Sequence, residues 1–315
     1  MHVPTIQPGT LVSRAAKSIR ARLSLAQSAT PFNITLLSIL VMLFFADIVL
    51  SQFVHLTGIS IFIEVWPETL FLFLCLLYCV LRPLPRLVET TELVIWSVLL
   101  SNALSPLVLI AGRSPRPLVD QDLMLIDRRM HISTEFFIYL VDQSHVLKLI
   151  FVLAYSSVGP LAVITILALP FFGYAHATRR FVLGTTLTLI LSSAIFALWP
   201  AIGPWTTQSF RPTSEQIGVA SYLMRLKSPG PVEVDLIHVG IISFPSFHVA
   251  LAILCGVALG SFRRIRVWLW ILIGLVCIST VTTGWHYGID VLGGIVVAVV
   301  SIAVAGWILQ SNCKL

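Results

Sequence analysis

Two histidines and an aspartate in the last third of the chain have the types and spacing needed for phosphate chemistry. His248 follows Pro245-Ser246, and His286 stands four residues before Asp290. Four residues make about one helical turn, so Asp290 can accept a hydrogen bond from one imidazole nitrogen and leave the other free to attack. An apolar run, a basic turn and a second apolar run separate the histidines. If both runs cross a membrane, the two imidazoles return to the same face.

The Pro245-Ser246 pair also predicts the start of a helix. Serine is a favoured N-cap residue, and the first N–H groups of a helix have no partner within it. A phosphate beside His248 can accept hydrogen bonds from these groups, so Ser246 is a candidate phosphate-binding residue.

The composition places these residues in a membrane protein. Hydrophobic residues make up 57% of the chain and charged residues only 11%, which is not typical of a soluble globular protein. Apolar runs of about 20 residues favour helices over a barrel. We therefore predict a single all-α, polytopic membrane bundle of about eight transmembrane helices. The predicted spans are 33–54, 60–81, 93–112, 146–172 (with a kink at Gly159-Pro160), 181–201, 243–261, 266–283 and 289–310.

The charge distribution predicts the orientation of this bundle. The net charge of +6 would suggest nucleic acid in a soluble protein, but here cationic loops orient the spans, so we expect a lipid bilayer and no nucleic acid. With the N-terminus inside, the cytoplasmic segments hold twelve Lys and Arg residues against two acids. This predicts cytoplasmic N- and C-termini and an extracytoplasmic active site. No obligatory protein partner is indicated.

Residues 1–30 are basic and contain no acid. A positive flank that holds the N-terminus inside is the favoured interpretation. An amphipathic helix on the membrane surface and an organelle transit peptide remain alternatives.

The two histidine motifs resemble those of a known enzyme superfamily. Pro-Ser-x-His followed by His-x-x-x-Asp is similar to the type-2 phosphatidic acid phosphatase/vanadium haloperoxidase superfamily. The forms Phe-Pro-Ser-Phe-His-Val-Ala and His-Tyr-x-x-Asp are closest to the inositol phosphorylceramide synthase-like (aureobasidin-resistance-protein-like) branch. This resemblance implies that His286 attacks phosphorus, Asp290 orients it and His248 protonates the leaving group. It also implies a six-helix core in residues 93–315, preceded by the basic segment 1–30 and by two additional helices in residues 31–92.

Two cations of the superfamily's usual phosphate clamp are missing. Ser279-Thr280 stand where Ser-Arg normally precedes the second histidine. The first motif keeps only Arg211-Pro212, with Pro204 in the place of its Lys. A phosphoryl group in transfer carries charge on three oxygens and needs such donors. Arg211 is the first candidate to supply them, followed by Arg225 and Lys227; the alternative for each is a solvated loop charge.

The first long connection, 113–145, contains a polar, partly periodic segment that predicts a surface helix over the pocket. Its polar residues are Asp120, Asp122, Asp127, Arg128, Arg129 and His131. The segment Trp199–Trp205 ends the fifth span on the same side and resembles the Pro/Trp-rich segment after the corresponding helix in the ceramide-phosphotransferase branch, which implies a place near the pocket. The alternative is a helix stop with interfacial tryptophans. His131, His145 and His238 lie on this side but belong to no motif.

These observations predict an integral membrane phosphotransfer enzyme that acts on a lipid phosphate or phospholipid head group through a phosphohistidine, with no metal or cofactor. An alcohol acceptor makes a head-group transferase, which the branch resemblance and the missing Arg favour. Water as acceptor makes a lipid phosphate phosphatase, acting on phosphatidic acid or a polyprenyl pyrophosphate. Two further classes stay open: a metal site built from the two histidines and the aspartate, and a non-catalytic transporter or scaffold on the same fold.

The charge asymmetry generates a topology prediction. In a cysteine-free background, a membrane-impermeant thiol reagent added from outside should label single cysteines placed in 113–145 or 202–242. Cysteines placed in 174–180 or 262–266 should remain unlabelled until the membrane is opened. The reverse pattern would overturn the extracytoplasmic site.

Overall fold

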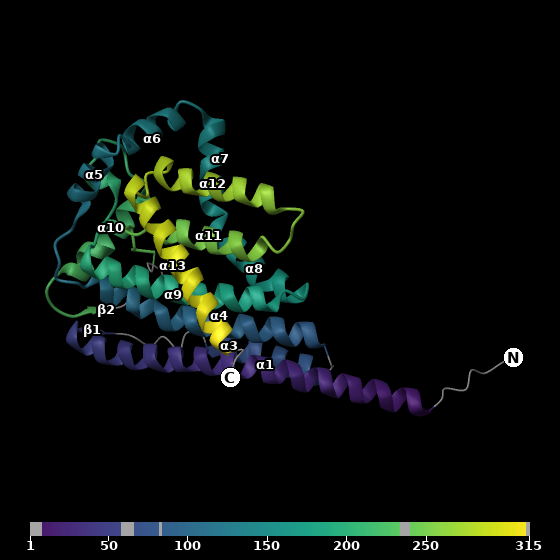
Figure 1. Ribbon diagram of the computed structural model, residues 1–315. Coiled ribbons are helices and arrows are strands. Elements are labelled where there is room, and N and C mark those ends of the chain that lie inside the picture. Colours follow the sequence, from purple (N-terminus) through teal and green to yellow (C-terminus); the bar gives the residue numbers. More distant parts are fainter. Residues whose placement is uncertain (1–7, 58–65, 82–83, 234–239, 313–315) are drawn as a thin grey trace.

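The computed structural model is helical almost throughout the residues that it describes, which are 8–57, 66–81, 84–233 and 240–312 (Figure 1). In chain order the elements are α1 (Pro8–Phe53), β1 (Leu56–Thr57), α3 (Trp66–Leu81), α4 (Pro85–Gly112), α5 (Asp120–Arg129), α6 (Thr134–Asp142), α7 (His145–Ser156), α8 (Val158–Phe171), α9 (Ala175–Leu198), the 3-10 turn η1 (Pro204–Thr206), α10 (Ser214–Lys227), β2 (Val232–Glu233), α11 (Phe247–Leu259), α12 (Arg266–Thr282) and α13 (Gly288–Asn312). The predicted all-α membrane bundle is confirmed.

The eight predicted spans correspond to these helices. Within the described residues, four stretches are long and apolar enough to cross a membrane: Pro31–Phe53 of α1, α4, α9 and Gly288–Ser311 of α13. Together α7 and α8 make a fifth if the bent pair is one span, and the bend between them is 42°. Pro160, in the first turn of α8, has no N–H for a helical bond back to Ser156, which is consistent with the predicted kink. The other three are the shorter apolar helices α11, α12 and the described part of α3.

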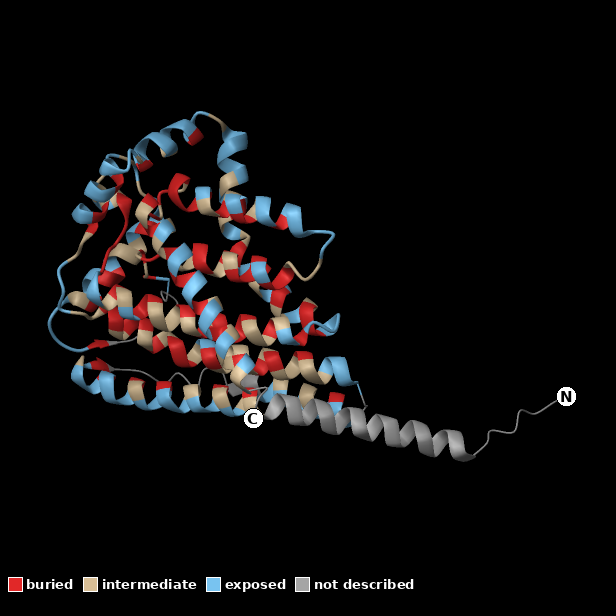
Figure 2. Ribbon diagram, viewed as in Figure 1, coloured by how far each residue is buried: buried red, intermediate tan, exposed pale blue. Residues whose placement is uncertain are grey.

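Helix α9 lies at the centre of the bundle and packs against α4, α8, α11 and α13. Two glycines allow close approach between helices here. A Cβ on Gly184 would lie 2.9 Å from Leu254 of α11, and one on Gly256 would overlap Ile273 of α12. The buried side chains therefore gather between these helices (Figure 2).

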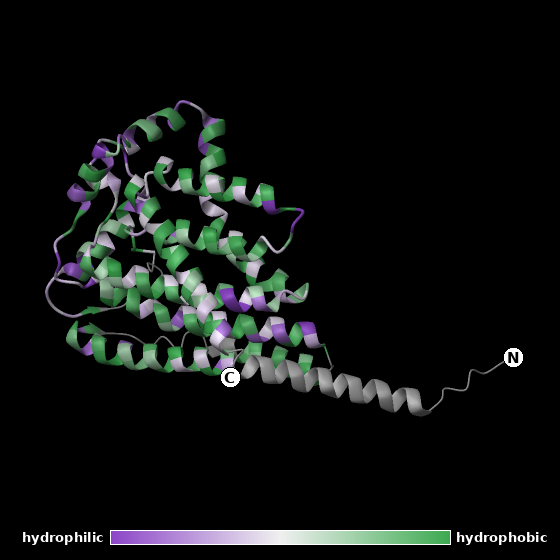
Figure 3. Cartoon of the chain, viewed as in Figure 1, coloured by the Kyte–Doolittle hydropathy of each residue, from purple (hydrophilic) through white to green (hydrophobic). Residues whose placement is uncertain are grey.

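The outer faces of the bundle are apolar (Figure 3). Trp268 on α12 is 73% exposed and Trp307 on α13 is 70% exposed. In water such side chains would be costly to expose, whereas in a bilayer they face lipid chains.

The side chain of Arg113, just after α4, forms hydrogen bonds with the end of α1 and with the end of α10 and the segment after it. Its guanidinium donates to the carbonyls of Val54 at 2.9 Å, Leu226 at 2.8 Å, Ser228 at 3.2 Å and Gly230 at 2.7 Å. The pairing of β1 with β2 joins the same segments. The Arg113 side chain thus attaches the end of α1 and the end of α10, with the segment after it, to α4.

Candidate active site

The two histidine motifs meet where α11 begins and where the turn between α12 and α13 ends. The Ser246 side chain accepts a hydrogen bond from the N–H of Val249 at 3.4 Å, so the predicted N-cap is present. The N–H of Ser246 donates to the carbonyl of Asp290 at 3.0 Å. This backbone bond joins the start of α11 to the first turn of α13 and brings the motifs side by side.

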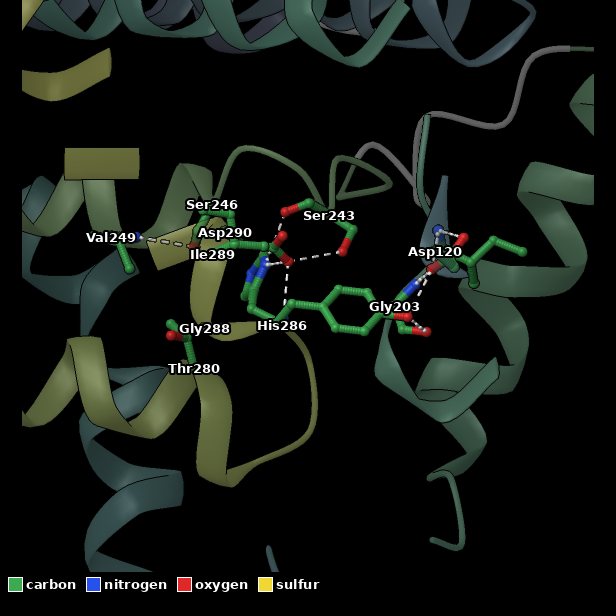
Figure 4. Close-up of polar contacts among 12 residues, drawn as sticks. Asp120, Gly203, Ser243, Ser246, Val249, Thr280, His286, Gly288, Ile289 and Asp290 are labelled. Atoms are coloured by element: carbon green, nitrogen blue, oxygen red, sulfur yellow. Dashed lines mark hydrogen bonds and ion pairs between the residues drawn. The ribbon is translucent and has the colours of Figure 1, made fainter. Parts of the chain in front are cut away.

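The hydrogen bonds of His286 identify which of its ring nitrogens keeps a free lone pair (Figure 4). Its Nδ1 lies 2.9 Å from the carbonyl of Ser243 and 3.3 Å from Oδ2 of Asp290. A carbonyl oxygen can only accept, so Nδ1 carries the proton and Nε2 of the neutral ring keeps a free lone pair. Asp290 lies beside Nδ1 as expected, although His286 stands in the turn before α13 and not one helical turn away on the same helix. Sequence reasoning missed Ser243, because a backbone carbonyl leaves no signature in the residue types.

The other contacts of Asp290 keep its carboxylate in place. Oδ2 accepts from the N–H of Tyr287 at 2.9 Å and from the hydroxyl of Ser243 at 3.3 Å. The orienting group is therefore held by the same turn that carries His286 and by the segment that precedes α11.

Burial sets the protonation state of His286. The residue is only 3% exposed, and burial lowers its pKa to about 4, although the bond to Ser243 acts in the opposite direction. The imidazole is neutral near pH 7, and protonation, which would block attack, occurs only as the pH falls toward that value.

His248 lies beside His286, with 6.1 Å between the ring centroids. This separation allows one phosphoryl group to contact both rings. Tyr155 of α7 stacks on His248 with centroids 4.5 Å apart, and Trp285 lies parallel to Tyr155 at 6.2 Å. Tyr155 was not among the predicted site residues, since it belongs to a distant apolar helix with no motif.

The polar segment of the first long connection forms α5, and its two buried aspartates hold the site loops. Asp127 accepts from the N–H of Gly288 at 2.7 Å and of Ile289 at 2.8 Å. Seven residues earlier on the same face, Asp120 accepts from the N–H of Gly203 at 2.8 Å and from the hydroxyl of Tyr287 at 3.2 Å. Burial raises the pKa of both carboxyls, and these backbone hydrogen bonds oppose the rise.

A cavity of about 760 Å³ opens onto both histidines. Its polar wall includes Ser243, Ser214 and Glu215. Tyr155, Trp205 and Trp285 supply aromatic rings, so the segment Trp199–Trp205 reaches the pocket as expected. The described lining residues include no Lys or Arg.

The four predicted phosphate-binding residues lie outside this described lining. Lys227 donates to the carbonyls of Ser114 at 2.8 Å and Arg116 at 3.0 Å, and burial lowers its pKa. The guanidinium of Arg225 lies over the ring of Tyr222, 5.2 Å from its centroid. Ser246 is fully buried as the N-cap of α11, whereas Arg211 is exposed before α10.

Arg211 nevertheless belongs to a loop that touches the histidine turn. Gly284 has a φ of +75°, in the left-handed region that favours glycine, and a Cβ there would lie 2.8 Å from the ring of Phe210. The role of Arg211 in phosphate binding remains a prediction.

In the part of the chain that the structure describes, no group of three or more His, Cys, Asp or Glu residues is placed to hold a metal ion. His248, His286 and Asp290 therefore do not form the arrangement that the metal alternative requires. His131 and His145 are not among the cavity's described lining residues, and His238 lies outside the described residues.

Comparison with protein-family profiles matches residues 121–304, more than half of the chain, to the PAP2 superfamily. Neither the comparison with curated proteins nor the comparison with solved structures gave a match. The matched range contains both histidine motifs and α5 from its second residue onward.

The contacts of α5 generate a prediction about positioning. Asp127→Ala should leave the two N–H groups at the start of α13 without acceptors. We expect a loss of about 1–3 kcal/mol in the free energy of unfolding and a lower turnover, because the His286 turn loses its anchor. Asp122→Ala is the matched control, since Asp122 lies on the same helix and is exposed. Unfolding and turnover of both variants should be measured in one detergent; equal effects would contradict the anchoring role.

Proposed function

Because the chain belongs to the PAP2 superfamily of phosphatases and phosphotransferases that act on lipid phosphates, we propose that it transfers a phospholipid head group to an alcohol, in the manner of inositol phosphorylceramide synthases. Enzymatic activity follows from the family. The head-group transfer is the finer proposal, and a lipid phosphate phosphatase is the alternative with which it is compared.

In the first step, Nε2 of His286 attacks the phosphorus of the donor lipid. A bond forms between nitrogen and phosphorus, and the bond between phosphorus and the lipid oxygen breaks. His248, which enters this step as the imidazolium, donates a proton to that oxygen, which leaves as the hydroxyl of a diacylglycerol. The hydrogen bond from Nδ1 of His286 to Ser243, with Asp290 beside it, stabilises the positive charge that develops on the imidazole.

In the second step, an acceptor hydroxyl gives its proton to His248 and its oxygen attacks the phosphohistidine. The bond between nitrogen and phosphorus breaks, and His286 returns to its neutral form. Water in place of the alcohol gives hydrolysis by the same route.

The observation that carries the preference for transfer is the lack of Lys and Arg in the described lining of the cavity. A phosphate monoester carries up to two negative charges near pH 7 and needs cationic donors. A phosphodiester carries one, and its head group adds hydroxyls or a cation that neutral and acidic side chains can contact. The cavity therefore fits a diester donor better than phosphatidic acid.

The family match, the paired motifs and the charge bias of the sequence support a division of the chain into parts and an orientation in the membrane. We propose that residues 93–315 form the catalytic unit, that 1–30 is a basic cytoplasmic segment and that 31–92 adds two helices. The N- and C-termini are cytoplasmic, and His286 faces the extracytoplasmic side.

The function is tested with two labelled donors and one acceptor. Purified enzyme with head-group-labelled phosphatidylinositol and ceramide should move the label to ceramide faster than it releases phosphate from phosphatidic acid. His286→Ala should abolish both reactions, whereas Asp290→Asn should retain a small fraction. Phosphate release without any transfer would establish the phosphatase alternative, and wild-type turnover by His286→Ala would remove the nucleophile assignment.

The role of Arg211 in phosphate binding is tested separately. If its guanidinium reaches the transferring phosphoryl group, Arg211→Ala should slow turnover roughly a hundredfold at saturating lipid. Arg211→Lys should recover only part of this, because lysine lacks the fork geometry. Arg225→Ala and Lys227→Ala are compared in the same assay, because these two residues are the other candidates for the clamp; the guanidinium of Arg225 lies over Tyr222. Normal turnover in Arg211→Ala would place the clamp elsewhere.

A further inference from the structure

A second cavity, with a few polar residues in its wall, lies at the opposite end of the bundle from His286. It has a volume of about 320 Å³ and lies between the beginning of α9, the end of α11 and α13. The helix α11 runs from His248 to this cavity, a length of about 20 Å at the rise of an α-helix. The proposed catalytic reaction uses none of its lining residues.

Arg180 is the charged residue in the wall of this cavity, with His176 and Ser261 as polar neighbours. Its Nη2 donates to the carbonyl of Ile302 on α13 at 3.2 Å. Its Nε is buried and has no hydrogen-bond partner among the described residues. The guanidinium packs onto Gly306, where a Cβ would lie 3.1 Å from Nη2. Arg180 is thus held at the cavity with part of its donor capacity unused.

Arg179, the adjacent arginine, has a carboxylate partner, which Arg180 lacks among the described residues. Arg179 forms a salt bridge with Glu89 at 3.1 Å, and its guanidinium lies over the ring of Phe32. Within the described residues, no carboxylate lies within salt-bridge distance of Arg180. A half-buried cation at a membrane helix end is costly without a counter-charge, so an anion is expected in the cavity.

A larger, mostly apolar cavity lies on the other side of the end of α11. Its volume is about 980 Å³, and Ser261 lines both cavities. Apolar side chains from α8, α11 and α12 form its walls, while Arg263 and Arg264 line its basic edge. An occupant of the two cavities together meets cations and apolar surface, which is the chemistry of a lipid with an anionic head group.

We propose that this end of the bundle binds an anionic phospholipid, with its phosphate at Arg180 and with Arg263 and Arg264 beside it, and with an acyl chain in the apolar cavity. The lipid supplies the negative charge that the described part of the protein does not supply to Arg180. The site is separate from the catalytic cavity and binds lipid of the opposite leaflet.

The proposal is tested by titrating the full chain in dodecyl maltoside with dioleoylphosphatidylglycerol. The chain carries His286→Ala to prevent turnover of the probe, and bound lipid is counted by native mass spectrometry. Arg180→Gln should weaken binding about tenfold, the loss typical of one charge-assisted hydrogen bond. Arg179→Gln is the matched control and should bind as the parent does, even if loss of the Glu89 pair lowers its thermal stability.

If Arg180→Gln does not fold, the double variant Arg263→Gln/Arg264→Gln tests the same site, because both residues are exposed on a turn. It should weaken binding at least threefold. The proposal would be overturned if every variant of Arg180, Arg263 and Arg264 that folds binds the lipid as tightly as the parent does. An equal loss of affinity in Arg179→Gln would also overturn it. Equal binding of dioleoylphosphatidylcholine would overturn the requirement for an anion. Thermal unfolding of the same protein is measured with inorganic phosphate and with the lipid. If inorganic phosphate alone stabilises the protein as much as the lipid does, the site binds the free anion rather than lipid.

Discussion

The site depends on two hydrogen bonds that the Asp127 carboxylate accepts from the first N–H groups of α13. The first N–H groups of any helix need acceptors from outside it, and here α5, far away in the sequence, supplies them. This contact determines where α13 begins and therefore where the preceding turn places His286. Asp120, on the same face of α5, adds the loop after α9 to the arrangement. The short polar helix α5 thus holds the loop after α9 and the turn between α12 and α13 in place relative to each other.

The site contains polar hydrogen-bonding groups but few positive charges. His286 is neutral because it is buried, and its orientation is set by an acceptor that cannot itself donate, the Ser243 carbonyl. His248 is covered by the ring of Tyr155. In the proposed reaction, fixed hydrogen bonds and the imidazolium of His286 stabilise the developing charge.

The two ends of α11 show how charge is handled at each side of the bundle. At its start, the buried Asp120 and Asp127 receive backbone N–H donors, so each buried charge is compensated within the protein. At its end, Arg180 has a single carbonyl acceptor among the described residues. The two ends thus differ in how much of a buried charge the described chain compensates, and the proposed lipid adds the counter-charge at Arg180.

The sequence by itself determined the class of fold and the identity of the central residues. Apolar runs of about 20 residues can only be helices in lipid. His286 and Asp290 are close enough in the chain to meet, but His286 lies in the turn before α13, so their contact depends on how that turn is held. The kink near Pro160 and the N-cap at Ser246, by contrast, are local. Only the tertiary structure decided that the Ser243 carbonyl orients His286, that Asp127 caps α13 and that Tyr155 covers His248. These contacts join segments 43, 161 and 93 residues apart, and a carbonyl or an aromatic ring on an apolar helix gives no local pattern that identifies its distant partner.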